Sequence, residues 1–296
     1  MDIDLIAPGL ERIVGADAPL DQIAHGLYFG EGPVWDRRKK RFLWVDIIGD
    51  TIHEWMPGVG RKTLVHPSGH ANGMTFDREG RLVIAGWSQR TIWRIEHDGT
   101  FTTIAERWQG KKFNSPNDIV VRSDGQVYWT DSAGGLVIPG MAGEDMQRHL
   151  DFQGVFRLTQ QGAVELVVED TTYPNGLCFS PDESILYVND TRLALIRAFD
   201  VNPDGSVKNG RVFHKLTGTE PGVADGMKCD QEGNVYCTGP GGIHVMDPGG
   251  RLLGRLRVPG HNTNLAWGDD DWRSLFVTTY HGVYRTRLNI PGVAVW

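Results

Sequence analysis

The sequence predicts an all-β fold, a six-bladed β-propeller with four antiparallel strands in each blade. One sequence unit occurs six times along the chain, and its copies share the same order of apolar strands and turn residues. Alternating apolar and polar runs with frequent turn signals are typical of antiparallel strands. Four strands in a unit of about 40–50 residues are typical of a propeller blade, and no segment has a convincing helical period.

The first strand of each unit begins at a polar residue that is usually followed by glycine. A charged turn and a second strand come next, as in NGLCFSPDESILYVND from Asn175. Asn175 and Gly176 have the sequence of a two-residue hairpin, but Pro174 before them cannot donate a hydrogen bond in a strand ladder. We call the first polar residues of the six units the opener residues; they are Glu31, Asn72, Asn117, Asn175, Asp225 and Thr263.

A third strand follows in all six units and a fourth in five of them, so the last unit lacks its outer strand. Residues 9–15 (GLERIVG) have a strand-like pattern without a unit of their own. We expect this N-terminal segment to become the outer strand of the last blade, which would close the ring and cover an exposed edge. No linker divides residues 1–296, so a single propeller domain is expected. A β-sandwich or two small barrels are the competing all-β interpretations.

The composition argues against several classes of partner. The formal net charge of −7 and the pI of about 5.8 disfavour nucleic acid and anionic membrane surfaces, which select basic proteins. No apolar run reaches the roughly 18 residues of a membrane helix, and the N-terminus lacks the basic and apolar regions of a signal peptide. The three cysteines have no metal-site spacing, so we expect buried thiols in a reducing, cytoplasmic compartment.

The inner strands of a propeller line its central channel, so the six opener residues should meet near one mouth. Two carboxylates and three carboxamides at equivalent positions would form an oxygen-rich ring, which suits one hard divalent cation. Calcium is the cation we favour; magnesium, manganese, iron(II) and zinc remain open, although no opener residue is a histidine. A metal-free polar channel filled with water is the alternative. Glycines after four of the opener residues would let the backbone turn tightly there.

Four stretches carry a family resemblance: GEGPVW (30–35), FNSPNDIVVRSDGQVYWTD (113–131), YPNGLCFSPDESILYVND (173–190) and ADGMKCDQEGNVYCTG (224–239). With these motifs the chain resembles the regucalcin/gluconolactonase family, also called the senescence marker protein family, and in particular its bacterial gluconolactonase-like branch. The resemblance covers nearly the whole chain. It implies a six-bladed propeller with one catalytic divalent metal ion in the channel, and hydrolysis of a sugar lactone.

By position, the resemblance implies Glu31, Asn175 and Asp225 as metal ligands and Asp225 also as the general base. Asn117 would face the metal or the substrate. Many gluconolactonases continue Pro-Pro-Tyr-Gly after the motif that ends at Asp131, whereas residues 132–154 diverge here. We expect this long connection to be a candidate lid over the channel mouth, and its divergence leaves the identity of the lactone open.

The same residues suggest a reaction. A bound cation can polarise a lactone carbonyl and lower the pKa of water, and the carboxylate of Asp225 can take the proton of the attacking water. We expect the amides of Asn72, Asn114 and Asn117 to bind substrate hydroxyls, and His70 to reach the substrate. The chain lacks the Gly-x-Ser-x-Gly elbow of a serine hydrolase, a dinucleotide fingerprint and a phosphate loop.

Two other functions remain open at this point. The same metal chemistry would serve a hydrolase of a non-sugar lactone or of a phosphotriester. A non-enzymatic propeller that binds calcium or a partner protein is the third interpretation, because propellers host many functions. A monomer and a small homo-oligomer are both compatible with the sequence.

Overall fold

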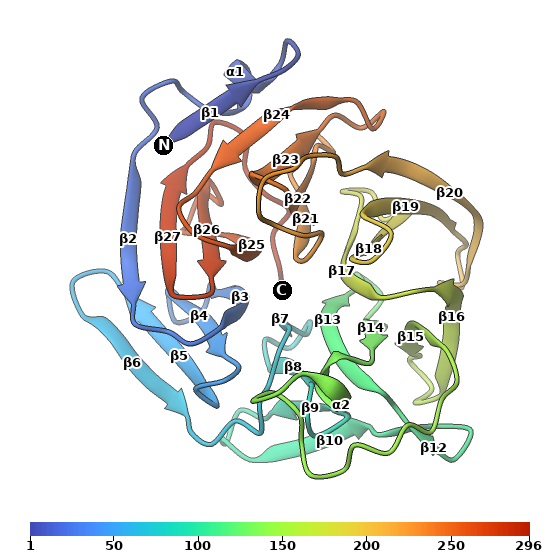
Figure 1. The fold of residues 1–296 in the computed structure, drawn as a ribbon. Helices are drawn as coiled ribbons and strands as arrows, with labels where there is room; N and C mark the ends of the chain where they lie inside the picture. Colours follow the sequence, from blue (N-terminus) through green and yellow to red (C-terminus); the bar gives the residue numbers. More distant parts are fainter.

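Six antiparallel β-sheets stand around a central axis in the computed structural model, which describes residues 1–296 (Figure 1). Five of these sheets have four strands and one has five. Each sheet is a blade, and the blades follow one another around the ring in sequence order, from blue to red in Figure 1. The fold is therefore the predicted six-bladed β-propeller.

The strands of the first three blades are given from the channel outwards. Blade 1 consists of β3 (Gly30–Asp36), β4 (Arg41–Asp46), β5 (Thr51–Met56) and β6 (Gly60–Val65). Blade 2 consists of β7 (Met74–Phe76), β8 (Leu82–Gly86), β9 (Thr91–Ile95) and β10 (Phe101–Ala105). A small ribbon precedes blade 3, namely β11 (Arg107–Trp108) and β12 (Lys111–Lys112). Blade 3 consists of β13 (Ser115–Val121), β14 (Val127–Ser132), β15 (Gln153–Leu158) and β16 (Val164–Thr171).

The last three blades continue this arrangement. Blade 4 consists of β17 (Pro174–Phe179), β18 (Ile185–Asp190), β19 (Leu195–Val201) and β20 (Val207–Lys215). Blade 5 consists of β21 (Met227–Cys229), β22 (Val235–Gly239), β23 (Gly242–Met246), β24 (Leu252–Arg257) and a fifth, N-terminal strand, β1 (Asp2–Leu5). Blade 6 consists of β25 (Asn262–Gly268), β26 (Ser274–Thr279), β27 (Gly282–Arg287) and β2 (Leu20–His25).

An N-terminal strand closes the ring in the last blade, but it is not the segment that the sequence pattern suggested. The outer strand is β2, which pairs with β27 from Leu20 opposite Thr286. Residues 9–15, expected as that strand, instead contain the one-turn helix α1 (Leu10–Ile13). The physical reason is that one helical turn puts Leu10 and Ile13 on the same face, and these two residues and Val14, directly after the turn, are buried in the core between blades 5 and 6.

Helical structure is confined to two single turns. Besides α1, the helix α2 (Gly134–Val137) lies in the connection between β14 and β15. Each helix has four residues, so neither has the length or the apolar surface that a membrane crossing requires. The three cysteines are free and buried, as expected from their sequence context.

Burial decreases from the inner to the outer strand of a blade. This explains why the inner strands do not alternate between apolar and polar residues. Every residue of β3 and β17 is buried, because these strands have a neighbouring blade on both sides. The outer strand β20 is mostly exposed or half-buried. Apolar side chains of neighbouring blades pack between the sheets, and the largest such cluster has 16 buried residues from blades 5 and 6 and the N-terminal segment. The blades therefore depend on one another for their cores.

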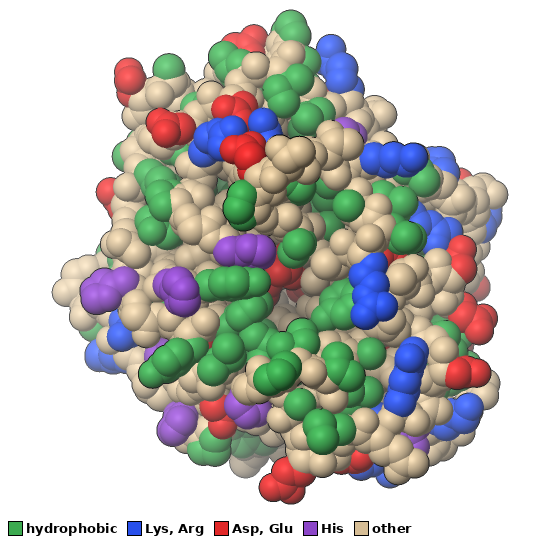
Figure 2. Space-filling model, viewed as in Figure 1, with side chains coloured by type: hydrophobic (Ala, Val, Ile, Leu, Met, Phe, Trp, Pro, Cys, Tyr) green, Lys and Arg blue, Asp and Glu red, His purple; other side chains and the backbone are tan.

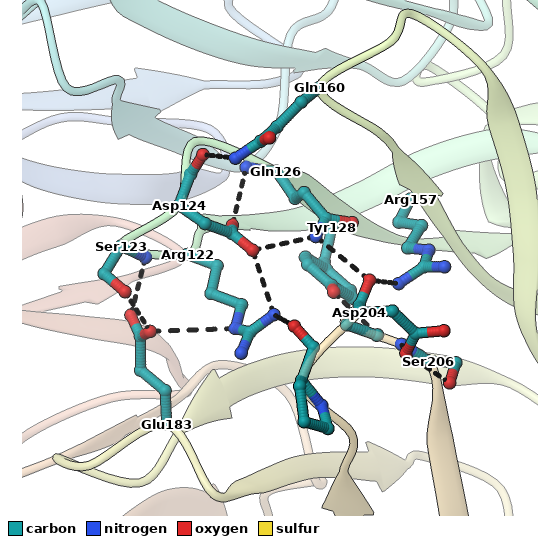
Figure 3. A network of polar contacts seen from close by, with 12 residues as sticks. Arg122, Ser123, Asp124, Gln126, Tyr128, Arg157, Gln160, Glu183, Asp204 and Ser206 are labelled. Atoms are coloured by element: carbon teal, nitrogen blue, oxygen red, sulfur yellow. Dashed lines mark hydrogen bonds and ion pairs between the residues drawn. The ribbon is translucent and has the colours of Figure 1, made fainter.

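A polar network joins blades 3 and 4 on the side of the strands that is remote from the opener residues (Figure 3). Ser123 donates its backbone N–H to Oε1 of Glu183 at 2.7 Å. Oη of Tyr128 donates to the carbonyl of Gly205 at 2.7 Å, and Nη1 of Arg157 donates to the carbonyl of Asp204 at 2.7 Å. Because these contacts link blade 3 to turns of blade 4, the network stabilises the ring at the end of the strands that is remote from the opener residues.

Candidate active site

The six opener residues lie at the same end of the six inner strands, around the channel. All six are buried, with exposed fractions of 9% or less. Figure 2 shows an opening at the centre of the ring, with acidic side chains inside it and hydrophobic side chains around it. The repeat therefore places its polar residues where the sequence pattern predicted, at one mouth of the channel.

The backbone carbonyls of several opener residues also join neighbouring blades. The N–H of Gly73 donates to the carbonyl of Asn117 at 2.8 Å, and that of Gly176 donates to the carbonyl of Asp225 at 3.0 Å. A Cβ atom on Gly176 would lie 2.3 Å from that same carbonyl oxygen. Glycine is thus required here by the close approach of two blades. The expected tight turn explains only Gly32, which has a φ of 54°.

A repeated aspartate holds the loop in front of three opener residues. The residues are Asp46, Asp131 and Asp190, each at or near the end of the second strand of its blade. Their carboxylates accept hydrogen bonds of 2.6–3.2 Å from backbone N–H groups two or three residues before an opener residue. These aspartates therefore position the mouth of the channel and are themselves turned toward the backbone.

Glu31 and Asp225 are the two acids of the opener ring. Burial raises the pKa of Glu31 to about 7, although the N–H of Gly32 donates to its Oε2 at 2.6 Å and Nδ2 of Asn264 donates to the same oxygen at 2.9 Å. Burial raises the pKa of Asp225 well above its ordinary value, and the nearby Glu31 carboxylate adds to this effect. The amide of Asn175 opposes it by stabilising the ionised form. The predicted ligands are thus brought together.

A third carboxylate and a lysine lie beside this pair, and the sequence pattern did not single them out. Asp118 directly follows an opener residue, is 2% exposed, and raises the pKa of both Glu31 and Asp225. Nζ of Lys228 lies 3.2 Å from Oδ2 of Asp118. Three carboxylates and one ammonium leave two negative charges when all four groups are ionised. Buried charge of this kind requires a partner, and one divalent cation would match it.

The donor atoms also fit a hard cation. No group of three or more His, Cys, Asp or Glu side chains is arranged to hold a metal ion, so amide oxygens would have to complete the ligand set. Asn175 donates through Nδ2 to Oγ1 of Thr191 at 3.1 Å, so its oxygen is the atom with lone pairs to offer a cation. Oδ1 of Asn72 is buried at the same ring and has no hydrogen-bond partner. Carboxylate and carboxamide oxygens are the ligands that calcium and magnesium prefer.

The other predicted substrate-binding residues differ in which of their polar atoms already have hydrogen-bond partners. Nδ2 of Asn72 donates to Oδ1 of Asn117 at 3.2 Å, so these two amides form a chain along the ring. Both N–H groups of Asn114 are used inside the protein, on Oδ2 of Asp131 at 3.0 Å and on the carbonyl of Phe152 at 2.9 Å. Oδ1 of Asn114 has no hydrogen-bond partner, but the residue is 0% exposed, so this structure does not open the amide to a substrate.

His70 is fixed by its own backbone and by blade 1. Its Nδ1 lies 2.7 Å from the carbonyl of Ile47, and its backbone N–H donates to Oδ1 of Asp50 at 2.7 Å. The backbone adopts a left-handed conformation with a φ of 51°. These contacts hold the ring at the opener end of blade 1 and leave Nε2 as the nitrogen available to a ligand.

The divergent connection 132–154 is hydrogen-bonded to the neighbouring blade 2. Oγ of Ser88 donates to the carbonyl of Met141, and Nη1 of the buried Arg90 donates to the carbonyl of Gln147 at 2.9 Å. Space beside α2 is tight, because a Cβ atom on Gly134 would lie 2.1 Å from Oη of Tyr173. The connection is thus anchored at several points near the channel, and whether it acts as a lid stays a prediction.

Two tyrosines near the acids were also missed from the sequence, although one of them lies in the YPNG motif. Burial raises the pKa of Tyr173 to about 12, and the charge of Asp225 adds to this rise. Burial likewise raises the pKa of Tyr280, with further contributions from Asp225 and Glu31. Both phenols therefore stay neutral at physiological pH and can donate hydrogen bonds beside the acids.

A cavity of about 340 Å³ occupies the other end of the channel. Its wall is mostly apolar and includes Lys228, which faces it from the side of the opener ring. The C-terminal segment also lines it: the N–H of Val293 donates to the carbonyl of Cys229 at 3.2 Å, and Nε1 of Trp296 donates to the carbonyl of Val121 at 3.3 Å. In Figure 1 the C-terminus lies near the centre of the ring. The chain itself therefore covers this end.

Comparison with known proteins gives consistent findings. The family model described as SMP-30/Gluconolactonase/LRE-like region matches residues 29–281. A gluconolactonase from Zymomonas mobilis is 30% identical over 313 aligned residues, which cover 98% of this chain and 87% of that protein. A pentonolactonase from Haloferax volcanii is 29% identical, over 86% of this chain and 82% of that protein. Among solved structures, a gluconolactonase from Xanthomonas campestris has a TM-score of 0.90 at 30% identity, covering 97% of this chain and 95% of that one.

Proposed function

This chain belongs to the SMP-30/Gluconolactonase/LRE-like family, and we propose that it is a lactonase that opens a sugar lactone to the aldonic acid. The relatives named above act on gluconolactone or pentonolactone by their names, and the chain matches them over nearly its full length. We further propose that the reaction depends on one divalent metal ion held by Glu31, Asn175 and Asp225.

The observation that carries the proposal is the pair of buried acids among amides at the mouth of the channel. Glu31 and Asp225 are 2% and 9% exposed, and burial raises the pKa of both. Ionising both acids without a counter-ion is costly in a buried site, and a bound cation would offset that cost. A divalent cation bound there supplies Lewis acidity, which stabilises negative charge on a lactone carbonyl oxygen. Calcium remains the favoured ion, because all donors are oxygen atoms.

The chain's own residues would divide the remaining work. Asp225 would act as general base and take the proton of the attacking water, and Glu31 would supply charge. Tyr173 and Tyr280 lie close enough to Asp225 for its charge to raise the pKa of both phenols, so they would donate hydrogen bonds to the substrate. Asn114 would position the loop in front of Asn117, since both N–H groups of its amide are engaged inside the protein and the residue is 0% exposed.

The test combines a lactone panel with metal depletion. Chelator-stripped protein would be assayed with a pH indicator on glucono-, xylono- and galactonolactone, before and after addition of Ca²⁺, Mg²⁺, Mn²⁺, Zn²⁺ or Fe²⁺. We expect activity to vanish on stripping and to return with one of these ions. Activity that persists in fully stripped protein would refute the metal dependence, and absence of turnover on every sugar lactone with metal bound would refute the substrate class.

Variants of the three proposed ligands separate binding from catalysis. Asp225→Asn should lower kcat by about 10²–10⁴-fold, because the general base is lost. Glu31→Gln should weaken metal affinity at least about tenfold, because one ligating charge is lost; Asn175→Ala should weaken it too, since it removes a ligand. Metal content is measured by elemental analysis after dialysis. The matched control is Asp270→Asn, which removes an exposed carboxylate paired with Lys40 and should change neither property.

A second substrate class is favoured by the surroundings of the mouth. Large apolar side chains are exposed on connections that leave from the opener end of the strands, namely Tyr28, Val137, Leu193 and Val223. Their exposed fractions of 38–69% would suit a lactone with an apolar substituent better than a bare sugar. An aromatic lactone in the same panel distinguishes the two. The panel should also include a phosphotriester. If the protein is instead a non-enzymatic binding protein, it should turn over none of these substrates and should bind its partner with or without metal.

A further inference from the structure

One ion pair crosses the channel below the opener ring. Asp118 is on the inner strand of blade 3, and Lys228 is on that of blade 5, so blade 4 lies between them in the ring. Nζ of Lys228 lies 3.2 Å from Oδ2 of Asp118 and donates to the carbonyl of Met227 at 3.0 Å. Their side chains are 23% and 3% exposed. The contact joins residues 110 positions apart, which makes it a product of ring closure.

The position of the pair is distinctive within the repeat. Asp118 directly follows the opener Asn117, and four of the six residues in this place are glycines. The only other side chain there is Asn264, whose Nδ2 donates to Oε2 of Glu31 at 2.9 Å. Both exceptions to glycine therefore place a polar group directly beneath the acids of the ring.

Lys228 stands at a boundary between two environments. Above it are the carboxylates of Asp118, Glu31 and Asp225; below it is the cavity of about 340 Å³ with its mostly apolar wall. Lys228 is the only basic side chain that lines this cavity. Its ammonium pairs with Asp118 and is the positive charge that lowers the pKa of Glu31.

The electrostatic contacts link all four groups. Asp118 raises the pKa of both Glu31 and Asp225, whereas Lys228 lowers that of Glu31. A surface ion pair would be screened by water, but these groups are largely buried, so each unit of charge acts strongly on any ion bound among them. Three negative charges and one positive charge leave a net charge of −2.

We propose that the Asp118–Lys228 pair sets the charge of the metal site and thereby its preference for divalent over trivalent cations. The inference rests on the proposed metal site of Glu31, Asn175 and Asp225. Lys228 contacts no proposed metal ligand and acts on the metal site only through its electrostatic field, so it is a positioning residue. If its charge is removed, the site carries a charge of −3. The attraction for an ion grows with the product of the charges, so a trivalent ion then gains more than a divalent one.

The experiment compares four full-length proteins: the natural chain, Lys228→Met, Asp118→Asn and the double variant. Each is stripped with a chelator and titrated with Ca²⁺ by calorimetry and with Tb³⁺ by its luminescence, which nearby aromatic side chains sensitise. We expect Lys228→Met to raise the ratio of Tb³⁺ to Ca²⁺ affinity at least about tenfold. Asp118→Asn should lower the ratio by a similar factor. The double variant restores the net charge of −2 and should bring the ratio back to that of the natural chain.

The opposite signs expected for the two single variants separate charge from packing, because a structural defect caused by breaking the pair would shift the ratio in the same direction in both. Lys40→Met, which breaks the exposed pair with Asp270, is the matched control and should leave the ratio unchanged. If Lys228→Met does not fold, Lys228→Gln keeps a hydrogen-bond donor and makes the same change of charge.

The outcomes distinguish this inference from the proposed function. If the natural chain binds both ions and Glu31→Gln abolishes binding, but the ratio is the same in all four proteins, the inference is wrong and the metal site stands. If the natural chain binds neither ion, or Glu31→Gln changes nothing, the metal site itself is refuted and this inference with it.

Discussion

Asn114 and Asn175 show how much the role of a side chain depends on what already occupies its polar atoms. Both are buried asparagines next to the channel. Asn114 donates its two N–H groups to Asp131 and to the carbonyl of Phe152. Asn175 donates to Thr191, and its amide stabilises the ionised form of Asp225. The same residue type therefore positions a loop in one blade and stabilises a buried carboxylate of the opener ring in the next.

Asp131 carries a prediction about pH at this scale. Burial raises its pKa to about 7, from 3.8, although Asn114 stabilises the ionised form. Between pH 4 and 7 the unfolded chain releases a proton that the folded chain retains, so this carboxyl lowers the stability of the fold as pH rises. In Asp131→Asn the residue cannot ionise. The stability of the variant relative to the natural chain should therefore increase with pH, by up to about 4 kcal/mol.

The measurement is urea unfolding at about pH 4.5, 6 and 7.5 in the presence of a chelator, so that pH-linked metal binding does not contribute. Asp182→Asn is the control, because the hydroxyl of Ser180 lowers the pKa of Asp182 and its effect has the opposite sign. A difference between Asp131→Asn and the natural chain that stays constant from pH 4.5 to 7.5 would contradict the prediction.

At the scale of elements, the inner strands of neighbouring blades touch through their backbones. The N–H of Gly176 donates to the carbonyl of Asp225, and the N–H of Gly226 donates to that of Thr263 at 2.7 Å. An opener residue thus presents its side chain to the channel while its carbonyl joins the blade before it. The position of each predicted ligand is set by two blades, not by its own strand alone.

Gly176→Ala tests this contact. The added Cβ atom would lie 2.3 Å from the carbonyl oxygen of Asp225, so the two blades must move apart. We expect a loss of about 1–3 kcal/mol in the free energy of unfolding, together with weaker metal binding. Gly15→Ala is the matched control, since nothing lies within 4 Å of its Cβ position, and it should cost less than about 0.5 kcal/mol. Equal stability of the two variants would mean that the blades are not held at this distance.

At the scale of the whole molecule, the N-terminal segment contributes strands to both blade 5 and blade 6. β2 completes blade 6 and β1 adds an outer strand to blade 5. Between them, Leu10, Ile13 and Val14 fill the core shared by these blades. The first and the last parts of the sequence are thus combined in one sheet, which removes the open edge of β27.

Truncation separates the two contributions. Removal of residues 1–25 should abolish cooperative folding, because β27 becomes an exposed edge and the core between blades 5 and 6 loses its N-terminal side chains. Removal of residues 1–8 takes away only β1 and its ion pairs from Asp4 to Arg255 and Arg257, so it should lower Tm by about 2–8 °C. Calorimetry and gel filtration measure both effects. Similar Tm values for the two truncated proteins would refute the prediction that β2 is required to close the ring.

Much of the fold and part of the site could be predicted from the repeat. Six units in phase place Glu31, Asn175 and Asp225 at equivalent positions, and a closed ring can only bring equivalent positions together. The strands of one blade are also consecutive in sequence, so their pairing is local. The segment 9–15 was misassigned because its apolar residues fit a short strand and one helical turn equally well, and only the core beside it distinguishes the two.

The sequence by itself determined the architecture and the ring of opener residues, because both follow from the period and phase of one local unit. The tertiary structure alone decided the pairing of Asp118 with Lys228, the use of the Asn114 donors, and the strand that closes the ring. These features depend on contacts between blades. Such contacts join residues far apart in the chain, and their distances exist only once the ring has closed.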